Sequence, residues 1–156
     1  MVLVALAVLA PLLGVHAAEP LRIRIVAANL TSGFGQSYDP GHGIRILQGL
    51  KPDVILMQEF RFGDNSAAAI RKMVDRIASS GFSFFREEPR SNGAIPNGLI
   101  SRWPILASGI WDDQAAGNRE FAWARIDMPG DIDLWVCAPS HKRPPALMRP
   151  CSLRRT

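Results

Sequence analysis

Hydrophobic and polar positions follow the two-residue period of a strand or the 3.6-residue period of a helix along most of the chain. Helical spacing is clearest over residues 67–79, a predicted helix that Asn65 or Ser66 can cap, and a shorter helix is predicted over residues 42–50. Strands are predicted over residues 21–27, 53–57, 82–85, 97–101, 105–111, 121–128 and 132–136. The order β-α-β-α-β followed by a β-meander predicts an α/β (α+β) layered domain.

The beginning of the chain is an apolar run without a charge. This run, residues 2–14, is shorter than the roughly 20 residues that a transmembrane helix needs. Val15 and Ala17 follow it and provide the small side chains that signal peptidase prefers. We therefore expect residues 1–17 to be a signal peptide, the protein to be secreted or periplasmic, and no stable membrane anchor to remain after cleavage. The alternative is a buried first strand or helix.

Composition divides the chain near residue 136. The whole chain of 156 residues carries a net charge of +4, but residues 136–156 hold five basic side chains and no acidic one. Residues 1–135 hold 13 basic and 14 acidic side chains, so their charge of −1 gives no support for strong binding of a polyanion. Both cysteines lie in this tail, and two cysteines exclude a disulfide-rich scaffold and a four-cysteine zinc site.

Three polar residues follow predicted strands and are candidates for chemistry. Glu59 comes directly after the strand over residues 53–57, and Asn29 follows the first strand. Ligands bind outside the carboxyl ends of strands in open α/β sheets, and a carboxylate there can bind a hard cation such as Mg²⁺. Arg102, whose guanidinium suits phosphate, follows a third strand. Taken singly, Glu59 is more simply explained as a solvated acid, Asn29 as a turn residue and Arg102 as a surface arginine.

Four segments in this order resemble the endonuclease/exonuclease/phosphatase superfamily: LRIRIVAANL, GLKPDVILMQEF, NGLISRWPILASG and NREFAWARIDM. The resemblance implies a deoxyribonuclease-I-like domain, a two-layer β-sandwich flanked by helices, of which residues 18–135 supply roughly the first half. It implies hydrolysis of phosphate esters with Mg²⁺ or Mn²⁺. By this resemblance Glu59 is a metal ligand, Asn29 is its neighbour at the metal, and Arg102 contacts phosphate, all three as catalytic residues.

The family's second half supplies a strand histidine, a "GDFN" motif and an "SDH" motif, and no segment of this chain matches the last two. His141 lies near the expected strand histidine, but its neighbours differ, and we assign it no role. Codons that encode residues 136–144 can spell Ser-Val-His-Leu-Leu-Thr-Ser-Ala one base later. We therefore hypothesise that the aberrant basic tail, residues 136–156, is read out of frame, which leaves the chain catalytically incomplete.

Three interpretations remain open at this point. The first is an exported, metal-dependent phosphodiesterase, nuclease or phosphatase whose chain is truncated. The second is a secreted α/β binding module without catalysis, and the third is a non-functional truncated product that does not fold stably. Nucleic acids, phospholipids and sugar phosphates are all acceptable substrates for such a fold, so the substrate is undetermined. No protein partner is implied.

Overall fold

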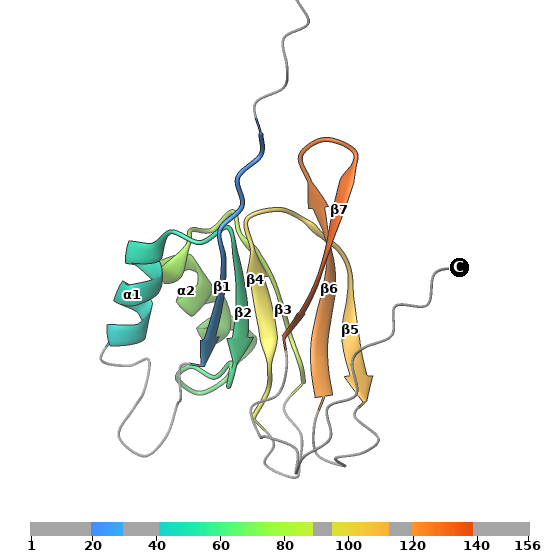
Figure 1. Cartoon of the computed structure of the whole chain (residues 1–156). Coiled ribbons are helices and arrows are strands. Elements are labelled where there is room, and N and C mark those ends of the chain that lie inside the picture. The colour runs from blue at the N-terminus through green and yellow to red at the C-terminus, as the bar shows by residue number, and fades with distance from the viewer. Residues whose placement is uncertain (1–19, 30–40, 89–94, 113–119, 139–156) are drawn as a thin grey trace, which may run out of the picture.

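The computed structural model describes residues 20–29, 41–88, 95–112 and 120–138. The predicted signal peptide and most of the predicted aberrant tail lie outside these residues. The described chain is mixed α/β, with two sheets and two helices (Figure 1). In chain order the elements are β1 (Ile25–Asn29), α1 (His42–Leu50), β2 (Val54–Gln58), α2 (Ala67–Ile77), β3 (Ser83–Arg86), β4 (Gly98–Ser101), β5 (Ile105–Asp112), β6 (Glu120–Met128) and β7 (Ile132–Ala138).

The first sheet has the strand order β1-β2-β4-β3, and the second has the order β5-β6-β7. β1 and β2 are parallel, with α1 in the connection between them, whereas every other neighbouring pair of strands in the two sheets is antiparallel. The predicted meander is thus confirmed for β5, β6 and β7. The antiparallel pairing of β2 with β4 decides which loops share an end of the first sheet.

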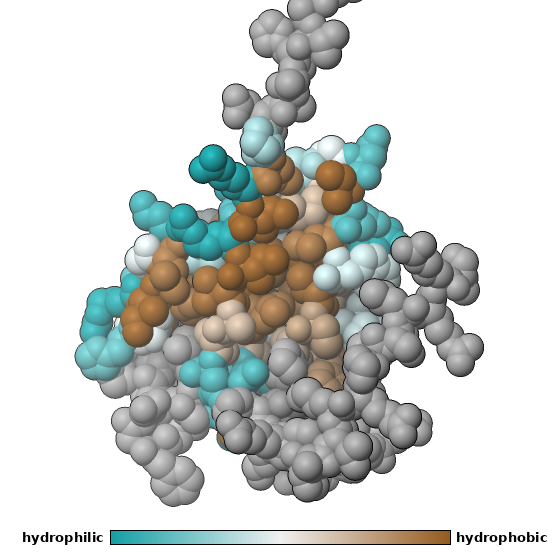
Figure 2. All heavy atoms as spheres, viewed as in Figure 1, coloured by the Kyte–Doolittle hydropathy of each residue, from teal (hydrophilic) through white to brown (hydrophobic). Residues whose placement is uncertain are grey.

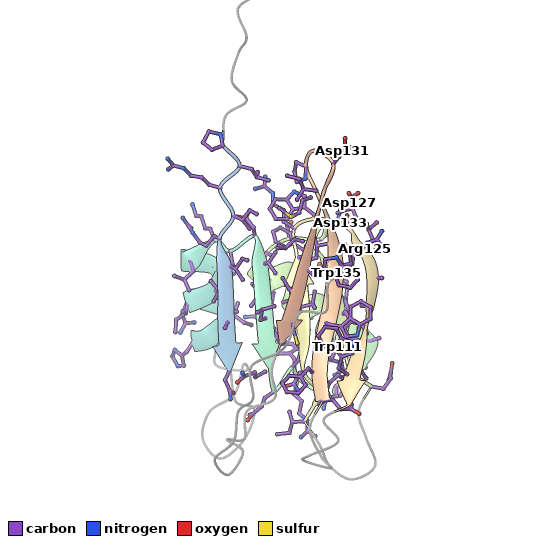
Figure 3. The ribbon with its side chains drawn as sticks, turned by 45° about the vertical axis from the view of Figure 1, so that its right-hand side comes forward. Trp111, Arg125, Asp127, Asp131, Asp133 and Trp135 are labelled. Atoms are coloured by element: carbon purple, nitrogen blue, oxygen red, sulfur yellow. The ribbon has the colours of Figure 1, made fainter. Side chains whose placement is uncertain are left out.

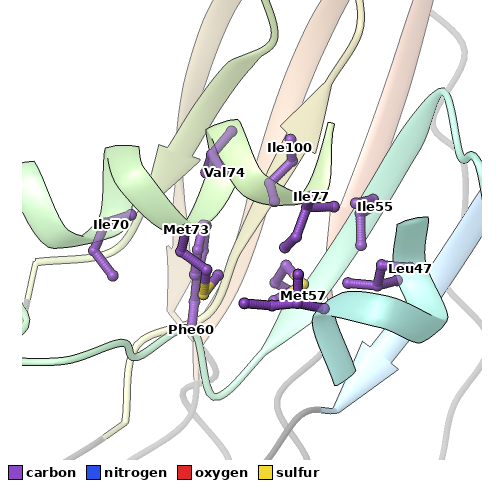
Figure 4. Packing of buried hydrophobic residues seen from close by; sticks show 10 residues of the cluster. Leu47, Ile55, Met57, Phe60, Ile70, Met73, Val74, Ile77 and Ile100 are labelled. Atoms are coloured by element: carbon purple, nitrogen blue, oxygen red, sulfur yellow. The ribbon is translucent and has the colours of Figure 1, made fainter. Parts of the chain in front are cut away.

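The two helices cover the outer face of the first sheet. Their apolar stripes face Ile55, Met57 and Ile100 of that sheet in one buried cluster (Figure 4). In α2 the stripe consists of Ile70, Met73, Val74 and Ile77. Removing these side chains from water stabilises the layer by about 1.5–3 kcal/mol for each large aliphatic residue. The helical periodicity of the sequence therefore correctly predicted which face of α2 is buried.

The inner face of the first sheet packs against the second sheet. Val54 and Leu99 from the first sheet form one cluster with Ala124, Ile126 and Met128 of β6. The strand β7 contributes Leu134 and Val136 to this layer and continues to Ala138, which is fully buried. β7 thus extends two residues beyond the predicted strand end, into the segment predicted to be aberrant.

The outer face of the second sheet carries a row of tryptophans. Trp123 of β6 stacks on Trp111 of β5 and on Trp135 of β7, with ring centroids 5.8 and 5.5 Å apart. Figure 3 shows Trp111 and Trp135 on this face, which no helix of the described chain covers. The indole of Trp123 lies over Gly109, where a Cβ atom would approach it to 3.0 Å. The absence of a side chain at Gly109 therefore leaves room for the Trp123 indole in the stacked row.

Two further element boundaries differ from prediction. The first strand was predicted from residue 21, but β1 begins at Ile25, and the Arg24 carbonyl just before it accepts the N–H groups of Asp53 and Val54. The helix α2 ends at Ile77 rather than residue 79, and its N-cap is Ser66, whose Oγ accepts the Ala69 N–H at 3.1 Å. Among the described helices, none has the length and hydrophobicity needed to cross a bilayer.

Candidate functional site

Two of the three predicted site residues lie at one end of the first sheet. Asn29 is the last residue of β1 and is paired in register with Gln58, the last residue of β2. Glu59 follows directly, so the parallel pairing brings the carboxyl ends of both strands to the same edge (Figure 1). This is the juxtaposition that the sequence predicted. Asn29 is exposed, whereas Glu59 is half-buried.

The backbone at Glu59 is strained. Its φ is +54°, in the left-handed region that costs a residue with a Cβ atom about 1–2 kcal/mol. The next residue enforces this turn: the Phe60 N–H donates to the Pro96 carbonyl at 2.6 Å, and its fully buried ring meets Phe84 edge-on. The fold thus sends Phe60 into the core and holds Glu59 in a conformation that its own side chain disfavours.

The carboxylate of Glu59 contains an unpaired buried atom. Its Oε2 is shielded from solvent and accepts no hydrogen bond from any residue in the described part of the chain. A buried polar atom without a partner costs about 1–3 kcal/mol, so most proteins avoid it. Strain and an unpaired oxygen at one residue together are typical of a functional site rather than of a structural turn.

The third predicted residue, Arg102, lies at the opposite end of the sheet. Its Nη1 forms an ion pair with Asp53 Oδ1 at 3.1 Å, and its backbone N–H donates to the Asp53 carbonyl at 2.8 Å. Asp53 precedes the five-residue strand β2 and Glu59 follows it, so about 17 Å of strand separates the two ends. The structure therefore does not bring Arg102 together with Glu59 and Asn29. The reason is the antiparallel direction of β4, whose end lies beside the beginning of β2.

Two other arginines lie near Glu59 instead. The Arg61 N–H donates to the Glu59 carbonyl at 2.8 Å, and Arg61 Nε is a second buried atom without a hydrogen-bond partner in the described chain. Arg86 donates to the Asn65 carbonyl at 3.1 Å and to Asn65 Oδ1 at 3.3 Å. Burial lowers the pKa of Arg86, the nearby charge of Glu88 raises it, and the positive charge of Arg61 lowers it further.

Sequence reasoning missed Arg61, although it lies only two residues after Glu59 in the same motif. The available signal was the spacing Glu-Phe-Arg at the end of an apolar strand. The inward turn at Phe60, which places Arg61 beside Glu59, could not be foreseen from the sequence.

A buried polar network joins the two sheets at this same end. The Asn97 backbone N–H donates to Glu87 Oε2 at 3.0 Å, and the Asn97 side chain lies 3.4 Å from the Glu120 carbonyl oxygen, to which it donates. Asn97, Glu87 and Glu120 are each less than one-tenth exposed. The adjacent Gly98 is required by close packing, since a Cβ atom there would lie 2.6 Å from the Phe60 ring and closer still to the Phe85 carbonyl. This network ties the end of β3 and the beginning of β4 to the beginning of β6.

Within residues 20–29, 41–88, 95–112 and 120–138, no three His, Cys, Asp or Glu side chains lie close enough together to hold a metal ion by themselves. Comparisons with models of protein families, with curated proteins and with solved structures found no match to this chain.

Proposed function

We propose that this protein is a metal-dependent hydrolase of phosphate esters whose metal site is at Glu59. The observation that carries the proposal is the buried Oε2 of Glu59, which is unpaired among the described residues, on a strained backbone at the carboxyl edge of two parallel strands. The resemblance to the endonuclease/exonuclease/phosphatase superfamily in four ordered segments supports the same reaction class.

The set of candidate ligands suits Mg²⁺ or Mn²⁺ better than a metal ion whose ligands are all supplied by the protein. Mg²⁺ keeps several waters and is commonly held by one or two carboxylates together with substrate phosphates. Glu59 would supply the anionic ligand, and Asn29, at the same strand edge, would supply a neutral amide oxygen. A bound Mg²⁺ would polarise a phosphoryl oxygen of the substrate.

Arg61 is the residue that we propose for phosphate contact at this end, in place of Arg102. Its buried Nε lacks a hydrogen-bond acceptor in the described chain, and a phosphate oxygen would be one. Arg86 is less suited, because its donors already hold the Asn65 loop. Arg102 is engaged with Asp53 at the other end and keeps a positioning role there.

The family resemblance implies an Asp/Asn pair and an "SDH" motif that no segment of the given sequence matches, and losing one member of such a set costs a factor of about a thousand. Metal binding is therefore a sharper test than turnover. The proposed reaction is hydrolysis of a phosphate ester bond, whatever alcohol the phosphate is bound to.

Electron paramagnetic resonance of Mn²⁺ titrated into the full chain tests the site directly. We expect binding by the wild type, loss of that binding in Glu59→Gln, and retention in Glu88→Gln, which removes an exposed carboxylate nearby. Equal Mn²⁺ affinity in the wild type and Glu59→Gln would refute the proposal. Hydrolysis of bis(p-nitrophenyl) phosphate with and without Mg²⁺ is the accompanying activity assay.

A further inference from the structure

Basic side chains from three distant segments gather at the end of the first sheet opposite Glu59. Arg22 and Arg24 precede β1, Lys51 lies between α1 and β2, and Arg102 follows β4. An open pocket of about 320 Å³ is lined by Arg22, Ile23, Arg24, Lys51 and Asp53, and Arg102 forms an ion pair with Asp53. Figure 2 shows hydrophilic residues at this end, beside the point where the chain enters β1. The pocket is thus a product of the fold and not of a run of basic sequence.

Asp53 accepts hydrogen bonds from Arg24 and Arg102. Its Oδ2 accepts the Arg24 backbone N–H at 2.9 Å, and its Oδ1 accepts Arg102 Nη1 at 3.1 Å. The Arg24 guanidinium donates through Nη1 to the Leu50 carbonyl, at the end of α1. Both carboxylate oxygens are therefore occupied by protein donors, and the side chain is only 16% exposed. The one acid of the pocket is held inward and is poorly placed to repel an anion.

The remaining positive charge is uncompensated. Arg22 and Lys51 are exposed, and neither side chain makes an ion pair or hydrogen bond with another residue in the part of the chain that the structure describes. The pocket lining therefore holds three cations and one carboxylate, and Arg102 pairs with that carboxylate from the end of β4. A group of acids, Asp127, Asp131 and Asp133, lies on the β6–β7 hairpin of the other sheet (Figure 3), where Asp133 is paired with Arg125.

We infer that this pocket binds an anion that carries at least two phosphate groups. Its volume is at the lower end of the range for small-ligand sites, and the guanidinium and ammonium groups that line it suit tetrahedral oxyanions. The site is separated from Glu59 by the length of β2, so it is distinct from the proposed metal site and does not depend on it. A free diphosphate and a phospholipid headgroup present the same chemistry to it.

Titration calorimetry of the full chain with inorganic pyrophosphate, in metal-free buffer of low ionic strength, tests this inference. We expect Arg22→Gln and Lys51→Gln each to weaken binding roughly two- to fivefold, the usual range for one exposed charge contact. Lys72→Gln removes an exposed charge from α2, away from the pocket, and should leave the affinity unchanged. Circular dichroism of each variant controls for folding.

A second arm separates the two sources of phosphate. Vesicles of three parts phosphatidylcholine and one part cardiolipin, whose headgroup carries two phosphates, are sedimented with the wild type and with Lys51→Gln. Pyrophosphate binding that depends on Lys51, without vesicle binding, supports a free ligand, and vesicle binding that also depends on Lys51 supports a headgroup. Pyrophosphate affinity that is equal in the wild type and Lys51→Gln, or lowered as much by Lys72→Gln, overturns the inference in favour of diffuse charge attraction.

Discussion

Replacing Glu59 by glycine should stabilise the metal-free protein, although it removes the residue on which the proposed function depends. Glycine adopts the φ of +54° freely, which recovers about 1–2 kcal/mol, but it loses about 0.5–1 kcal/mol through the greater freedom of the unfolded chain. Removal of the buried, unpaired carboxylate oxygen recovers about 1 kcal/mol more, the lower end of the range because Glu59 is only half-buried. The net gain in the free energy of unfolding should be about 1–2.5 kcal/mol.

The variant Glu59→Gln separates these two contributions. It keeps the side-chain length and the strained φ but removes the charge, so we expect a smaller change than for Glu59→Gly, under about 1 kcal/mol. Urea unfolding followed by circular dichroism gives the free energies for the three proteins. Added Mg²⁺ should raise the unfolding midpoint of the wild type alone, because a ligand stabilises only the state that binds it.

Two results would refute this reasoning. A loss of about 1 kcal/mol or more in Glu59→Gly would mean that the side chain makes a stabilising contact that outweighs the strain. Equal stabilisation of all three proteins by Mg²⁺ would place the metal elsewhere on the molecule.

Three further perturbations follow from the packing and the caps. Gly98→Ala should destabilise the protein by about 2–3 kcal/mol in urea unfolding, because its Cβ atom would overlap the Phe60 ring and the Phe85 carbonyl, and a neutral result would contradict the close approach there. Trp123→Ala should cost about 3 kcal/mol and abolish the near-ultraviolet signal of the stacked tryptophans, whereas Trp135→Ala, which removes an exposed end of the row, should cost less. Ser66→Ala should cost about 1 kcal/mol by removing the N-cap of α2, and Ser66→Asn should restore most of it. Hydrogen bonds from Ser66 hold the pKa of Asp64 below its ordinary value. The stabilisation from this contact is therefore present above the pKa of Asp64 in the unfolded chain, and it is lost as the pH falls through the lowered pKa of the folded protein. Titration of the Asp64 carboxyl by nuclear magnetic resonance would show the lowered pKa.

The local sequence determined the helices, most strand positions and half of the candidate site. Periodicity alone placed Ile70, Met73, Val74 and Ile77 on the buried face of α2, since a 3.6-residue repeat allows one apolar stripe. The family resemblance implied that Asn29 lies beside Glu59, and the parallel pairing of β1 and β2 brings both to one edge of the sheet. The prediction of the buried face of α2 depends only on the properties of neighbouring residues.

Tertiary structure decided where Arg102 and Arg61 lie. The run that contains Arg102 predicts a strand but not its direction, and antiparallel pairing with β2 carried this side chain to the end opposite Glu59. Burial of Phe60 against Phe84 set the turn that leaves Glu59 Oε2 and Arg61 Nε shielded and unpaired among the described residues. Strand direction and the competition for space in the core depend on residues far apart in the chain, and no local pattern contains that information.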